Sequence, residues 1–491
     1  MFENRRNVII AAIVVVLIIA VVVLVVLNQK PAATKTAPII VNLNWWNADG
    51  GSKVYQNILD DFKKIPGYEN VNIKITDISY DENYNRKLLM EFARETAPDI
   101  FTLKSDTIPA WREFIAPITN LNTISNTNLI QNYRNDFVDI VNNDTIYRDQ
   151  IYGITNSVDS LQLYYNEDIL NQAGIALKPT NWKEMDEQLR KLNKRQNNTT
   201  FTQSGIALGT GLNKNNGDIV RDTNLPYFQD ILSMLMFQGG ELIFDENTQK
   251  STFNNPKNPK DITANRVTSQ NFDIQNKNKP ALDAIRFFAS FSDPRDNTRF
   301  SWSIDSNNAE EAFLQGKVAY MIHYRYFGDK IKEQNSRIKF GVADLPQVDS
   351  TQKRNYGTFY ANVINKNLET ENINSPNDTN AFYEYQVAKN FMYYLSLSST
   401  QEKILNLKGG VPAARKDLIE KQKLGDKTLS LFSLSNLYAK SYYKPSQKAT
   451  DQIWGRMLYR YNYENIPLEK AVEEAKQEYE ALIQRGPTIE F

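Results

Sequence analysis

Apolar and polar residues alternate with two different periods along the first part of the chain. Apolar side chains alternate with polar ones in 39–43 and 71–75, as expected for strands, and 99–103 is predicted as a third short strand. Between them, apolar residues recur every four positions in 54–62, and 81–96 also has helical spacing. The order β-α-β-α-β is typical of a parallel sheet covered by helices, so we predict an α/β fold.

A polar and aromatic loop follows directly on the first predicted strand. Residues 44–51 read NWWNADGG, and a second polar segment, 104–107, follows the third predicted strand. Ligands of parallel α/β sheets bind beyond the carboxyl ends of the strands. The loop at 44–51 is therefore expected at a ligand site, although a calcium loop or a hairpin turn with a hydrophobic plug would also fit its composition.

The spacing of the loop residues argues against calcium. An EF-like loop needs oxygen donors at its positions 1, 3 and 5, glycine at 6 and glutamate at 12. With Gly50 at position 6, Asp49 and Asn47 fall correctly at positions 5 and 3. Position 1 is then Trp45 and position 12 is Gln56, so neither end of the loop carries a carboxylate.

Residues 8–27 form an uninterrupted apolar run, and as a helix of about 20 residues it would cross the hydrocarbon layer of a membrane. Arg5 and Arg6 precede the run, which favours a cytoplasmic N-terminus. A cleaved signal peptide has a shorter apolar core, and no A-x-A-like site follows this one at once. We therefore expect a cytoplasmic segment (1–7), a single-pass anchor in the cell membrane (8–27), a linker (28–38) and an extracytoplasmic body.

Composition excludes several classes of site and partner. Lys+Arg and Asp+Glu both number 57, so the chain lacks the basic excess of a nucleic-acid binder. It has no cysteine and one histidine, His323, which excludes thiol nucleophiles, cysteine zinc sites and clusters of imidazole ligands. We expect no cofactor and no bound metal, and we expect His323 to be buried and hydrogen-bonded.

Several motifs occur in an order that resembles the family 1 extracellular solute-binding proteins, the maltose-binding-protein-like receptors of ABC importers. YGITNSVDSLQLYYNEDILNQAGI (152–175) resembles the first crossover of that family, and PTNWKEM (179–185) resembles its P-x-T-W-x-E-L helix start. FLQGKVAYMI (313–322), GVADLP (341–346) and GGVPAARKDL (409–418) are similar to three further elements. The lipid-carrying cysteine of many members is missing.

The resemblance covers about 39–483 and implies two α/β lobes that close on a ligand like a hinged clamp. Lobe 1 would consist of 39–156 and 323–360, and lobe 2 of 157–322 and 361–491. In fold class, the resemblance implies a two-lobe periplasmic-binding-protein-like clamp with hinge crossovers, preceded by the transmembrane helix.

The function implied by the resemblance is that of a membrane-anchored receptor, not an enzyme. It would bind a sugar or oligosaccharide between the lobes and deliver it to an ABC permease, and we expect it to act as a monomer. An anchored glycoside-active enzyme is an alternative, because Asp49, Asp99 and Asp159 could supply a pair of carboxylates about 5–9.5 Å apart. A non-transport sensor or adhesion module on the same fold is a third possibility.

Flat aromatic faces and planar polar groups are the side chains that suit a sugar. The loop after the first strand supplies both kinds in Trp45, Trp46, Asn47 and Asp49, although one tryptophan could instead belong to the core. Ser157 and Asp159 lie on the predicted crossover, where they could contact ligand or only cap and bridge the hinge.

The remaining candidates come from segments that the resemblance places near the cleft. Tyr164 and Tyr165 are adjacent on a strand, so one of them can face the cleft and the other the core. Tyr324 and Tyr326 follow the second crossing strand, and a glycine in the third would let the backbone approach a ligand. The expected ligand contacts are Trp45, Trp46, Asn47, Asp49, Asp99, Ser157, Asp159, Tyr164, Trp302, Tyr324, Tyr326, Gly357, Thr358 and Arg415.

Overall fold

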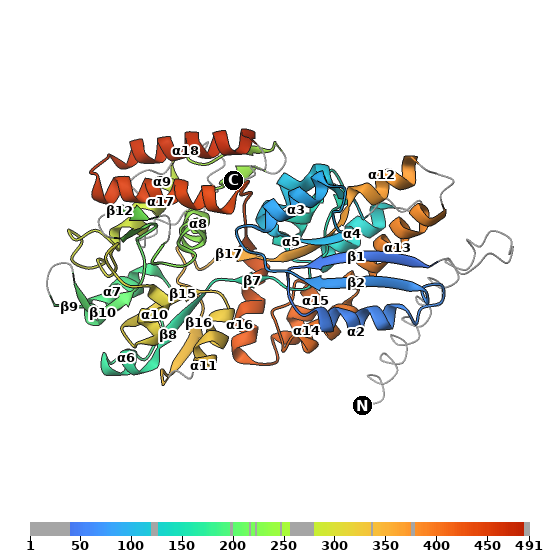
Figure 1. Ribbon diagram of the computed structural model, residues 1–491. Coiled ribbons are helices and arrows are strands. Elements are labelled where there is room, and N and C mark those ends of the chain that lie inside the picture. Colours follow the sequence, from blue (N-terminus) through green and yellow to red (C-terminus); the bar gives the residue numbers. More distant parts are fainter. Residues whose placement is uncertain are drawn as a thin grey trace, which may run out of the picture.

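The computed structural model shows two α/β lobes side by side, joined by short crossing strands (Figure 1). The described residues are 40–118, 126–196, 200–215, 218–220, 223–245, 248–255, 279–334, 337–374 and 379–485. The predicted anchor at 8–27 and its flanks, 1–7 and 28–38, lie outside them. Across the described ranges, no helix has both the length and the apolar character that a membrane span needs.

The first lobe is built on a five-stranded sheet with the order β2-β1-β3-β18-β4. Strand β1 pairs in parallel with β2 and β3, whereas β18 runs antiparallel to β3 and β4. The predicted β-α-β-α-β order is confirmed, with the second helix shorter than expected. The elements are β1 (Val41–Asn47), α2 (Ser52–Phe62), β2 (Val71–Asp77), α3 (Tyr84–Ala93), β3 (Ile100–Lys104), the 3₁₀ helix η1 (Ser105–Phe114), β4 (Ile115–Ala116) and β18 (Tyr360–Asn365).

Strand β1 continues four residues further than the alternation at 39–43 predicts. The same alternation carries on through the loop sequence, so that Val41, Leu43 and Trp45 all point into the core. Trp45 is fully buried, with its ring centroid 4.7 Å from that of Tyr55 on α2 and 6.0 Å from that of Phe391. The two tryptophans therefore belong to the strand and not to the loop after it.

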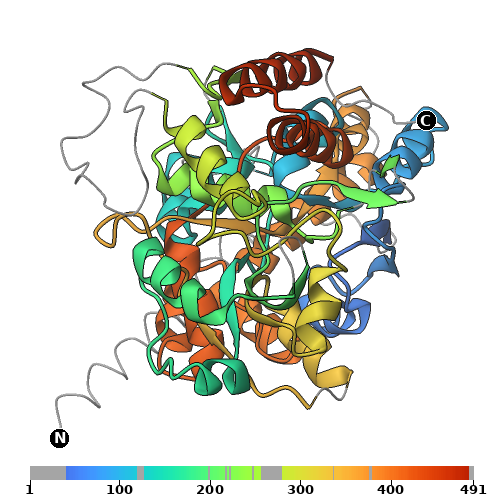
Figure 2. The same cartoon turned by 90° about the vertical axis from the view of Figure 1, so that its left-hand side faces the viewer.

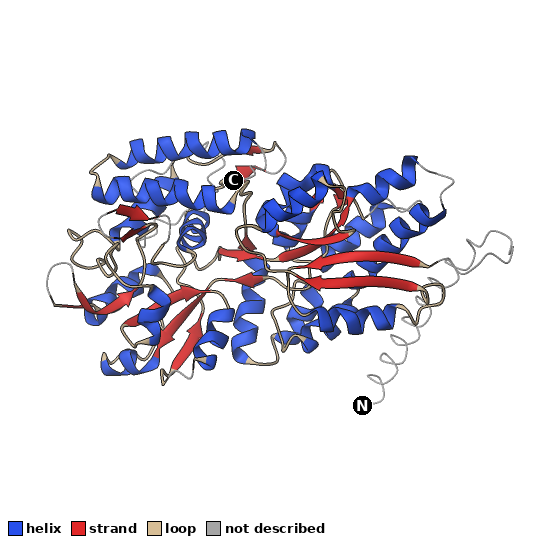
Figure 3. Cartoon of the chain, viewed as in Figure 1, coloured by secondary structure: helices blue, strands red, loops and turns tan. Residues whose placement is uncertain are grey.

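The second lobe contains another five-stranded sheet, with the order β16-β8-β15-β10-β9. Its central strand β15 is completely buried, and helices flank the sheet in the same way as in the first lobe (Figure 3). Helices α17 and α18 pack together at one end of the lobe (Figure 2). The elements are β8 (Gln162–Asn166), α6 (Glu167–Gln172), α7 (Trp182–Leu192), β9 (Lys194–Arg195), β10 (Phe201–Ile206), α8 (Phe228–Gln238), α9 (Pro280–Ser290), α10 (Ala309–Leu314), β15 (Val318–His323), α11 (Tyr326–Glu333), β16 (Phe340–Ala343), α17 (Gln447–Tyr463) and α18 (Leu468–Arg485).

Three short strands form a separate sheet between the lobes: β7 (Asp159–Ser160), β17 (Asn355–Thr358) and β19 (Ala439–Lys440). The strands approach closely at Gly357, where a Cβ atom would lie 3.0 Å from the Cβ of Ala439 and 3.1 Å from the Cδ1 of Ile140. The lack of a side chain at Gly357 thus allows the strands of the junction to approach closely.

The chain changes lobes at places that differ from the sequence expectation. Strand β16 pairs with β8, so much of 323–360 lies in the second lobe and not in the first. Strand β18 pairs with β3, and α13 packs on β1, so the chain after 360 returns to the first lobe before it reaches α17. Hydropathy could not show this, because β15, β16 and β18 are all apolar and only their hydrogen-bond partners distinguish the two sheets.

Further helices and strands complete the two lobes. In the first lobe and the junction these are α4 (Asn126–Asp136), α5 (Asp139–Thr145), β5 (Ile146–Tyr147), β6 (Gln150–Ile151), α12 (Lys366–Asn374), α13 (Thr379–Ser396), α14 (Ser398–Leu407), α15 (Lys416–Gln422), α16 (Lys427–Ser435) and η2 (Asn436–Tyr438). Two β-hairpins lie between β10 and α9 along the chain. They are β11 (Asn213–Asn215) with β12 (Asp218–Val220), and β13 (Phe244–Asp245) with β14 (Lys250–Ser251).

Truncation of Trp45 should test its assignment to the core. We expect Trp45→Ala to lower the free energy of unfolding by about 3–5 kcal/mol, because the substitution leaves a large cavity between β1, α2 and α13. Trp46→Ala is the matched control, since its ring lies half-buried on the opposite face of the strand and should matter less. Urea denaturation of both variants measures the difference, and equal stability of Trp45→Ala and the parent would contradict the assignment.

Candidate functional site

A cleft of about 880 Å³ opens between the two lobes and is lined by residues of both. Its first-lobe wall includes Tyr80 and Tyr360, and its second-lobe wall includes Tyr227 and Tyr326. Asp159 of β7 contributes to the lining from the junction. The volume lies within the range of small-molecule sites, and the cleft lies at the carboxyl ends of β1 and β3, where the α/β rule places a ligand.

Two tyrosines form an aromatic platform on the first-lobe wall. Tyr80 and Tyr360 have ring centroids 5.3 Å apart at an interplanar angle of 58°, and Tyr84 stacks on Tyr80 at 4.4 Å from within the lobe. The Tyr80 hydroxyl accepts a hydrogen bond from the backbone N–H of Lys104 at 3.2 Å. The rings are therefore held in place by stacking and by the end of strand β3.

The second-lobe wall carries another pair, Tyr227 and Tyr326, whose ring centroids are 6.2 Å apart. These side chains are 37% and 40% exposed and line the cleft, so their rings are accessible to a ligand there. Tyr227 donates to the Tyr326 hydroxyl at 3.2 Å, and Tyr326 donates to the buried carboxylate of Glu310 at 3.0 Å. His323 holds that carboxylate from behind, with 2.8 Å between Nε2 and Oε1.

The backbone of Tyr227 adopts the left-handed conformation, with φ 57° and ψ 24°. A bulky side chain rarely occupies this region, and residues held there cluster at functional sites. Here the conformation starts helix α8 and places the ring edge-on against Tyr324, with centroids 4.9 Å apart. The strained backbone of Tyr227 thus accompanies the placement of its aromatic ring at the cleft.

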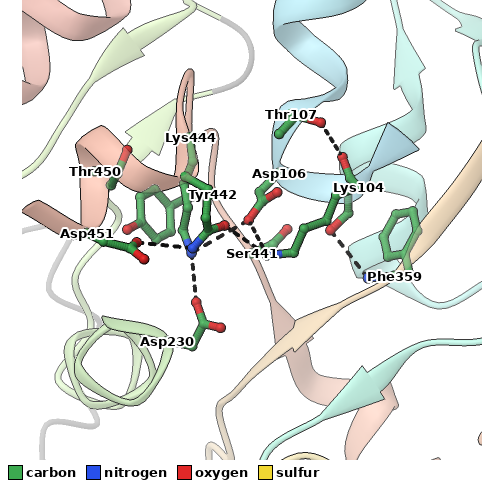
Figure 4. A network of polar contacts seen from close by, with 12 residues as sticks. Lys104, Asp106, Thr107, Asp230, Phe359, Ser441, Tyr442, Lys444, Thr450 and Asp451 are labelled. Atoms are coloured by element: carbon green, nitrogen blue, oxygen red, sulfur yellow. Dashed lines mark hydrogen bonds and ion pairs between the residues drawn. The ribbon is translucent and has the colours of Figure 1, made fainter. Parts of the chain in front are cut away.

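A buried lysine joins the two lobes behind the cleft (Figure 4). Lys444 is completely buried in the segment between β19 and α17, and its Nζ lies 2.7 Å from Asp230 of α8 and 3.6 Å from Asp106 of η1. Lys104 completes what we term the Lys444 cluster, with its Nζ 3.2 Å from the Asp106 carboxylate. The cluster thus connects a first-lobe carboxylate to a second-lobe carboxylate through one ammonium group.

Within the Lys444 cluster, attraction between opposite charges offsets the unfavourable free energy of burying them. Burial lowers the pKa of Lys444, but the carboxylate of Asp230 and the other acids around it raise that pKa well above its usual range. Burial likewise raises the pKa of Asp230, and the ammonium groups of Lys444 and Lys104 outweigh this effect and lower it. Lys444 and Asp230 therefore stay charged at neutral pH, and removal of one leaves the other uncompensated.

Asp159 forms no ion pair with a side chain among the described residues, in contrast to Asp49 and Asp230, which also line the cleft. Burial raises its pKa to about 7, although the backbone N–H and the guanidinium of Arg325 oppose the shift. Both carboxylate oxygens accept from that N–H at 3.2 Å. The side chain therefore lies in the cleft as a carboxyl group that titrates near neutral pH.

Six of the residues expected from sequence line the cleft: Asp49, Ser157, Asp159, Tyr324, Tyr326 and Thr358. Asp49 is already engaged, because its carboxylate accepts from the Tyr55 hydroxyl at 2.7 Å and pairs with Lys408. The Thr358 hydroxyl, in contrast, is buried and has no hydrogen-bond partner among the residues that the structure describes. Thr358 and Asp159 therefore both have hydrogen-bonding capacity left for a ligand.

Four more of the expected ligand contacts, on strand β1 or just before β3, are not part of the cleft lining. Trp45 is core, and Trp46 lies half-buried on the opposite face of β1. Asn47 is also buried, and its Nδ2 donates to Asp77 at 2.7 Å, so it holds the turn after the strand. Asp99 precedes β3 and accepts from the backbone N–H of Asn44 at 2.7 Å, which places it at the opposite end of the sheet from the cleft.

Four further candidates have structural roles outside the lining. Tyr164 is buried and donates to the backbone oxygens of Tyr324 and Arg325 at 3.1 Å, where it supports the start of α11. Trp302 lies in the core of the second lobe. Arg415 bonds the backbone oxygen of Ser396 at 2.9 Å and pairs with Asp136 and Asp417, so it closes the first lobe. Gly357 packs the junction as described above, and His323 is buried and hydrogen-bonded as expected.

Sequence reasoning missed most of the tyrosines that form the two walls. Tyr80 follows the second predicted strand, so the rule for strand ends could have found it. Tyr227 lies in a polar, loop-rich stretch in which no periodicity marks it. Lys444 likewise carries no local signal, because its charge partners are Asp106 and Asp230, far away in sequence. Across the described residues, no group of three or more His, Asp or Glu side chains could hold a metal ion.

Comparison with known proteins gives matches across most of the chain. The sequence profile of the bacterial extracellular solute-binding proteins matches residues 57–428. A protein of Brucella abortus (strain 2308), named as a binding protein, is 23% identical over 247 residues, which are 49% of this chain and 50% of that one. The chain therefore spans about half the length of the curated relatives that it matches.

Solved structures with low identity share the fold. The cyclic α-maltosyl-1,6-maltose-binding protein of Arthrobacter globiformis matches with a TM-score of 0.65 at 13% identity, covering 91% of this chain and 100% of that one. An ABC transporter solute-binding protein of Thermotoga lettingae, bound to α-D-tagatose, matches with a TM-score of 0.60 at 16% identity, covering 90% and 100%.

Removal of the central ammonium should show how strongly the Lys444 cluster supports the fold. We expect Lys444→Met to lower the free energy of unfolding by about 3–5 kcal/mol, because Asp230 then stays buried without its closest cation. Lys448→Met is the control, since Lys448 forms an exposed pair with Glu82 that should contribute at most about 1 kcal/mol. Chemical denaturation followed by circular dichroism gives both values, and equal losses would show that the cluster is not an anchor.

Asp159 should make stability fall as pH rises, in comparison with an uncharged variant. Its carboxyl stays protonated in the folded chain up to about pH 7, whereas in the unfolded chain it ionises near pH 4. The folded state thus binds more protons over this window, so the parent should lose stability relative to Asp159→Asn from about pH 4 to about pH 7. Thermal denaturation of both proteins across that range measures the effect, and parallel curves would refute the assignment.

Proposed function

This chain belongs to the bacterial extracellular solute-binding protein family, and on that basis we propose that it binds a sugar or oligosaccharide in the interlobe cleft. The observation that carries the proposal is the presence of two tyrosine pairs, Tyr80 with Tyr360 and Tyr227 with Tyr326, on opposite walls of one cleft. Aromatic faces stack on the apolar C–H faces of sugar rings, and a ligand between the pairs would contact both lobes.

Polar groups around the tyrosines suit the hydroxyl groups of a sugar. Within the described ranges the Thr358 hydroxyl has no hydrogen-bond partner. Asp159 lies between the walls, and Lys104 lies at the carboxyl end of β3 with its Nζ 2.8 Å from Gln447. Such a small set of hydrogen-bonding groups in an otherwise aromatic cleft is typical of ligand sites. The similarity to a protein named for binding cyclic maltosyl-maltose and to a solute-binding protein bound to α-D-tagatose supports the same ligand class.

Closure of the lobes on the ligand would follow from the same arrangement. The lobes are connected through the short strands β7, β17 and β19, which can act as a hinge. A ligand that contacts both walls has a higher affinity for the closed form, and it shifts the equilibrium by that difference alone. The closed form would then deliver the sugar to an ABC permease, with the body held outside the cell by a single-pass anchor at 8–27 and acting as a monomer.

A glycoside-active enzyme receives less support from the arrangement. Of the three carboxylates considered for that role, Asp49 is engaged by Lys408 and Tyr55, and Asp99 lies at the far end of the sheet. Only Asp159 lies in the cleft with free capacity, whereas glycoside hydrolysis generally uses two carboxylates. The carboxylates named from sequence therefore favour a receptor over an enzyme.

Calorimetric titration of the purified chain with sugars tests the proposal directly. The panel contains monosaccharides, maltodextrins, mannobiose and cellobiose, and the protein is kept in a detergent that has no sugar headgroup. We expect at least one sugar to bind and to remain intact afterwards by chromatography. Binding of a non-sugar solute instead would refute the sugar class, and cleavage of an oligosaccharide would refute the receptor.

Substitution of one ring from each wall should weaken that binding. We expect Tyr227→Ala and Tyr360→Ala each to lower affinity about fivefold to thirtyfold, since the loss of one stacked ring accounts for roughly 1–2 kcal/mol. Tyr393→Ala is the control, because Tyr393 is 37% exposed on α13 and does not line the cleft. If all three variants bind the sugar as the parent does, the tyrosine walls are not the binding surface.

A further inference from the structure

The hydroxyl groups on the second-lobe wall are oriented by a buried carboxylate. Glu310 is 7% exposed; burial raises its pKa, but bonds from His323 and Lys330 outweigh this and lower the pKa to about 2. An ionised carboxylate accepts hydrogen bonds and cannot donate them, so the Tyr326 hydroxyl must donate its only proton to Glu310. Tyr227 must therefore donate to Tyr326, and the Tyr227 oxygen has only lone pairs left for the cleft.

Tyr324 and Asp159 extend this pattern along the same wall. The Tyr324 hydroxyl donates to the carboxylate of Asp230 at 2.8 Å, so its oxygen also has only acceptor capacity left. Asp159 accepts from the backbone N–H of Arg325, and when ionised it can only accept further bonds. We term Tyr227, Tyr324, Tyr326 and the ionised form of Asp159 the acceptor wall, because in this state each side chain can accept a hydrogen bond from a ligand and none has a proton free to donate.

Most of the cations that line the cleft already have a carboxylate partner. Three of its four lining cations have a carboxylate partner: Lys104 with Asp106 at 3.2 Å, Lys448 with Glu82 at 3.2 Å and Arg325 with Asp329 at 3.1 Å. The fourth, Arg86, belongs to the first lobe and donates to Asn83 at 2.7 Å. Within the described part of the chain, Asp159 forms no ion pair with a side chain, so it is the carboxyl group of the acceptor wall that lacks a cation.

These features together fit a ligand group that only donates hydrogen bonds and carries a positive charge. We propose that the cleft favours a saccharide with a protonated amino group, seated against the acceptor wall beside Asp159 and the exposed rings of Tyr227 and Tyr326. The proposal rests on the proposed function and narrows it to amino sugars. An ammonium group donates three hydrogen bonds and accepts none, and it is attracted by the negative faces of tyrosine rings. A cation beside Asp159 would also stabilise its ionised form, which burial disfavours in the free protein.

Pairs of sugars that differ only in the amino group measure how much this group contributes to affinity. Titration of the full-length chain compares glucosamine with glucose, galactosamine with galactose, and the β-1,4-linked glucosamine disaccharide with cellobiose and with its N-acetylated form. At neutral pH and low salt we expect at least one amino sugar to bind about tenfold more tightly than its neutral parent. The gain should disappear on N-acetylation and shrink as the salt concentration rises, because both changes weaken the charge interaction.

Two carboxylate variants test whether Asp159 causes the tighter binding of amino sugars. Asp159→Asn should bring the amino sugar and its neutral parent to within about twofold of each other, since it keeps the shape and removes the charge. Asp168→Asn, an exposed position on α6 of the same lobe, should leave the gain unchanged. A gain that survives in Asp159→Asn would overturn the proposal.

The remaining outcomes distinguish this inference from the proposed function. If neutral sugars, including the longer maltodextrins, bind as tightly as every amino sugar, the amino-group inference fails and the sugar receptor stands. If no sugar binds in either form, the proposed function fails and the inference fails with it.

Discussion

The ion pairs of Lys444 are the interaction on which the arrangement of the two lobes depends. One ammonium group, completely buried, lies between Asp230 of the second lobe and Asp106 of the first. Desolvation of three charges is unfavourable, and it is tolerated here because each charge has an opposite charge within a few ångströms. Since Lys444 is supplied by the segment that leads into α17, the last crossing of the chain also fixes how the lobes meet behind the cleft (Figure 4).

The cleft in front of this cluster follows from the same geometry. Lys104 ends strand β3 and pairs with Asp106, which places the carboxyl end of the first sheet beside the Lys444 cluster. Tyr324 donates to Asp230 from the other side, so the second-lobe wall is attached to the cluster as well. The charged groups thus lie at the back of the site, and the tyrosine rings, which have polarisable faces, remain for the ligand. Aromatic rings on rigid supports lose little entropy on binding, which suits recognition of a sugar.

Hydrogen-bond direction adds a property that shape alone does not show. Glu310 lies behind the wall and is not part of the cleft lining, yet its charge determines where the proton of Tyr326 points, and through Tyr326 that of Tyr227. A cleft lined with tyrosines can accept or donate depending on such buried partners. In this protein, the buried carboxylates Glu310 and Asp230 turn the wall into an acceptor surface, and a receptor with a different buried residue behind the same rings would select different ligands.

The sequence by itself determined the local elements and the family: the alternation at 41–45, the helical spacing after Ser52 and the ordered motifs predict an α/β protein of this kind with its site at the strand ends. It also placed Asp159, Tyr326 and Thr358 at the cleft, because they lie on the crossing segments. Only the tertiary structure decided the rest. Trp45 continues the strand into the core, β16 and β18 join opposite sheets, and Tyr227 and Lys444 reach the site from segments without periodic signal. The physical reason is that periodicity reports which face of an element is buried, whereas pairing of strands, of charges and of hydroxyl groups depends on partners far apart in the chain.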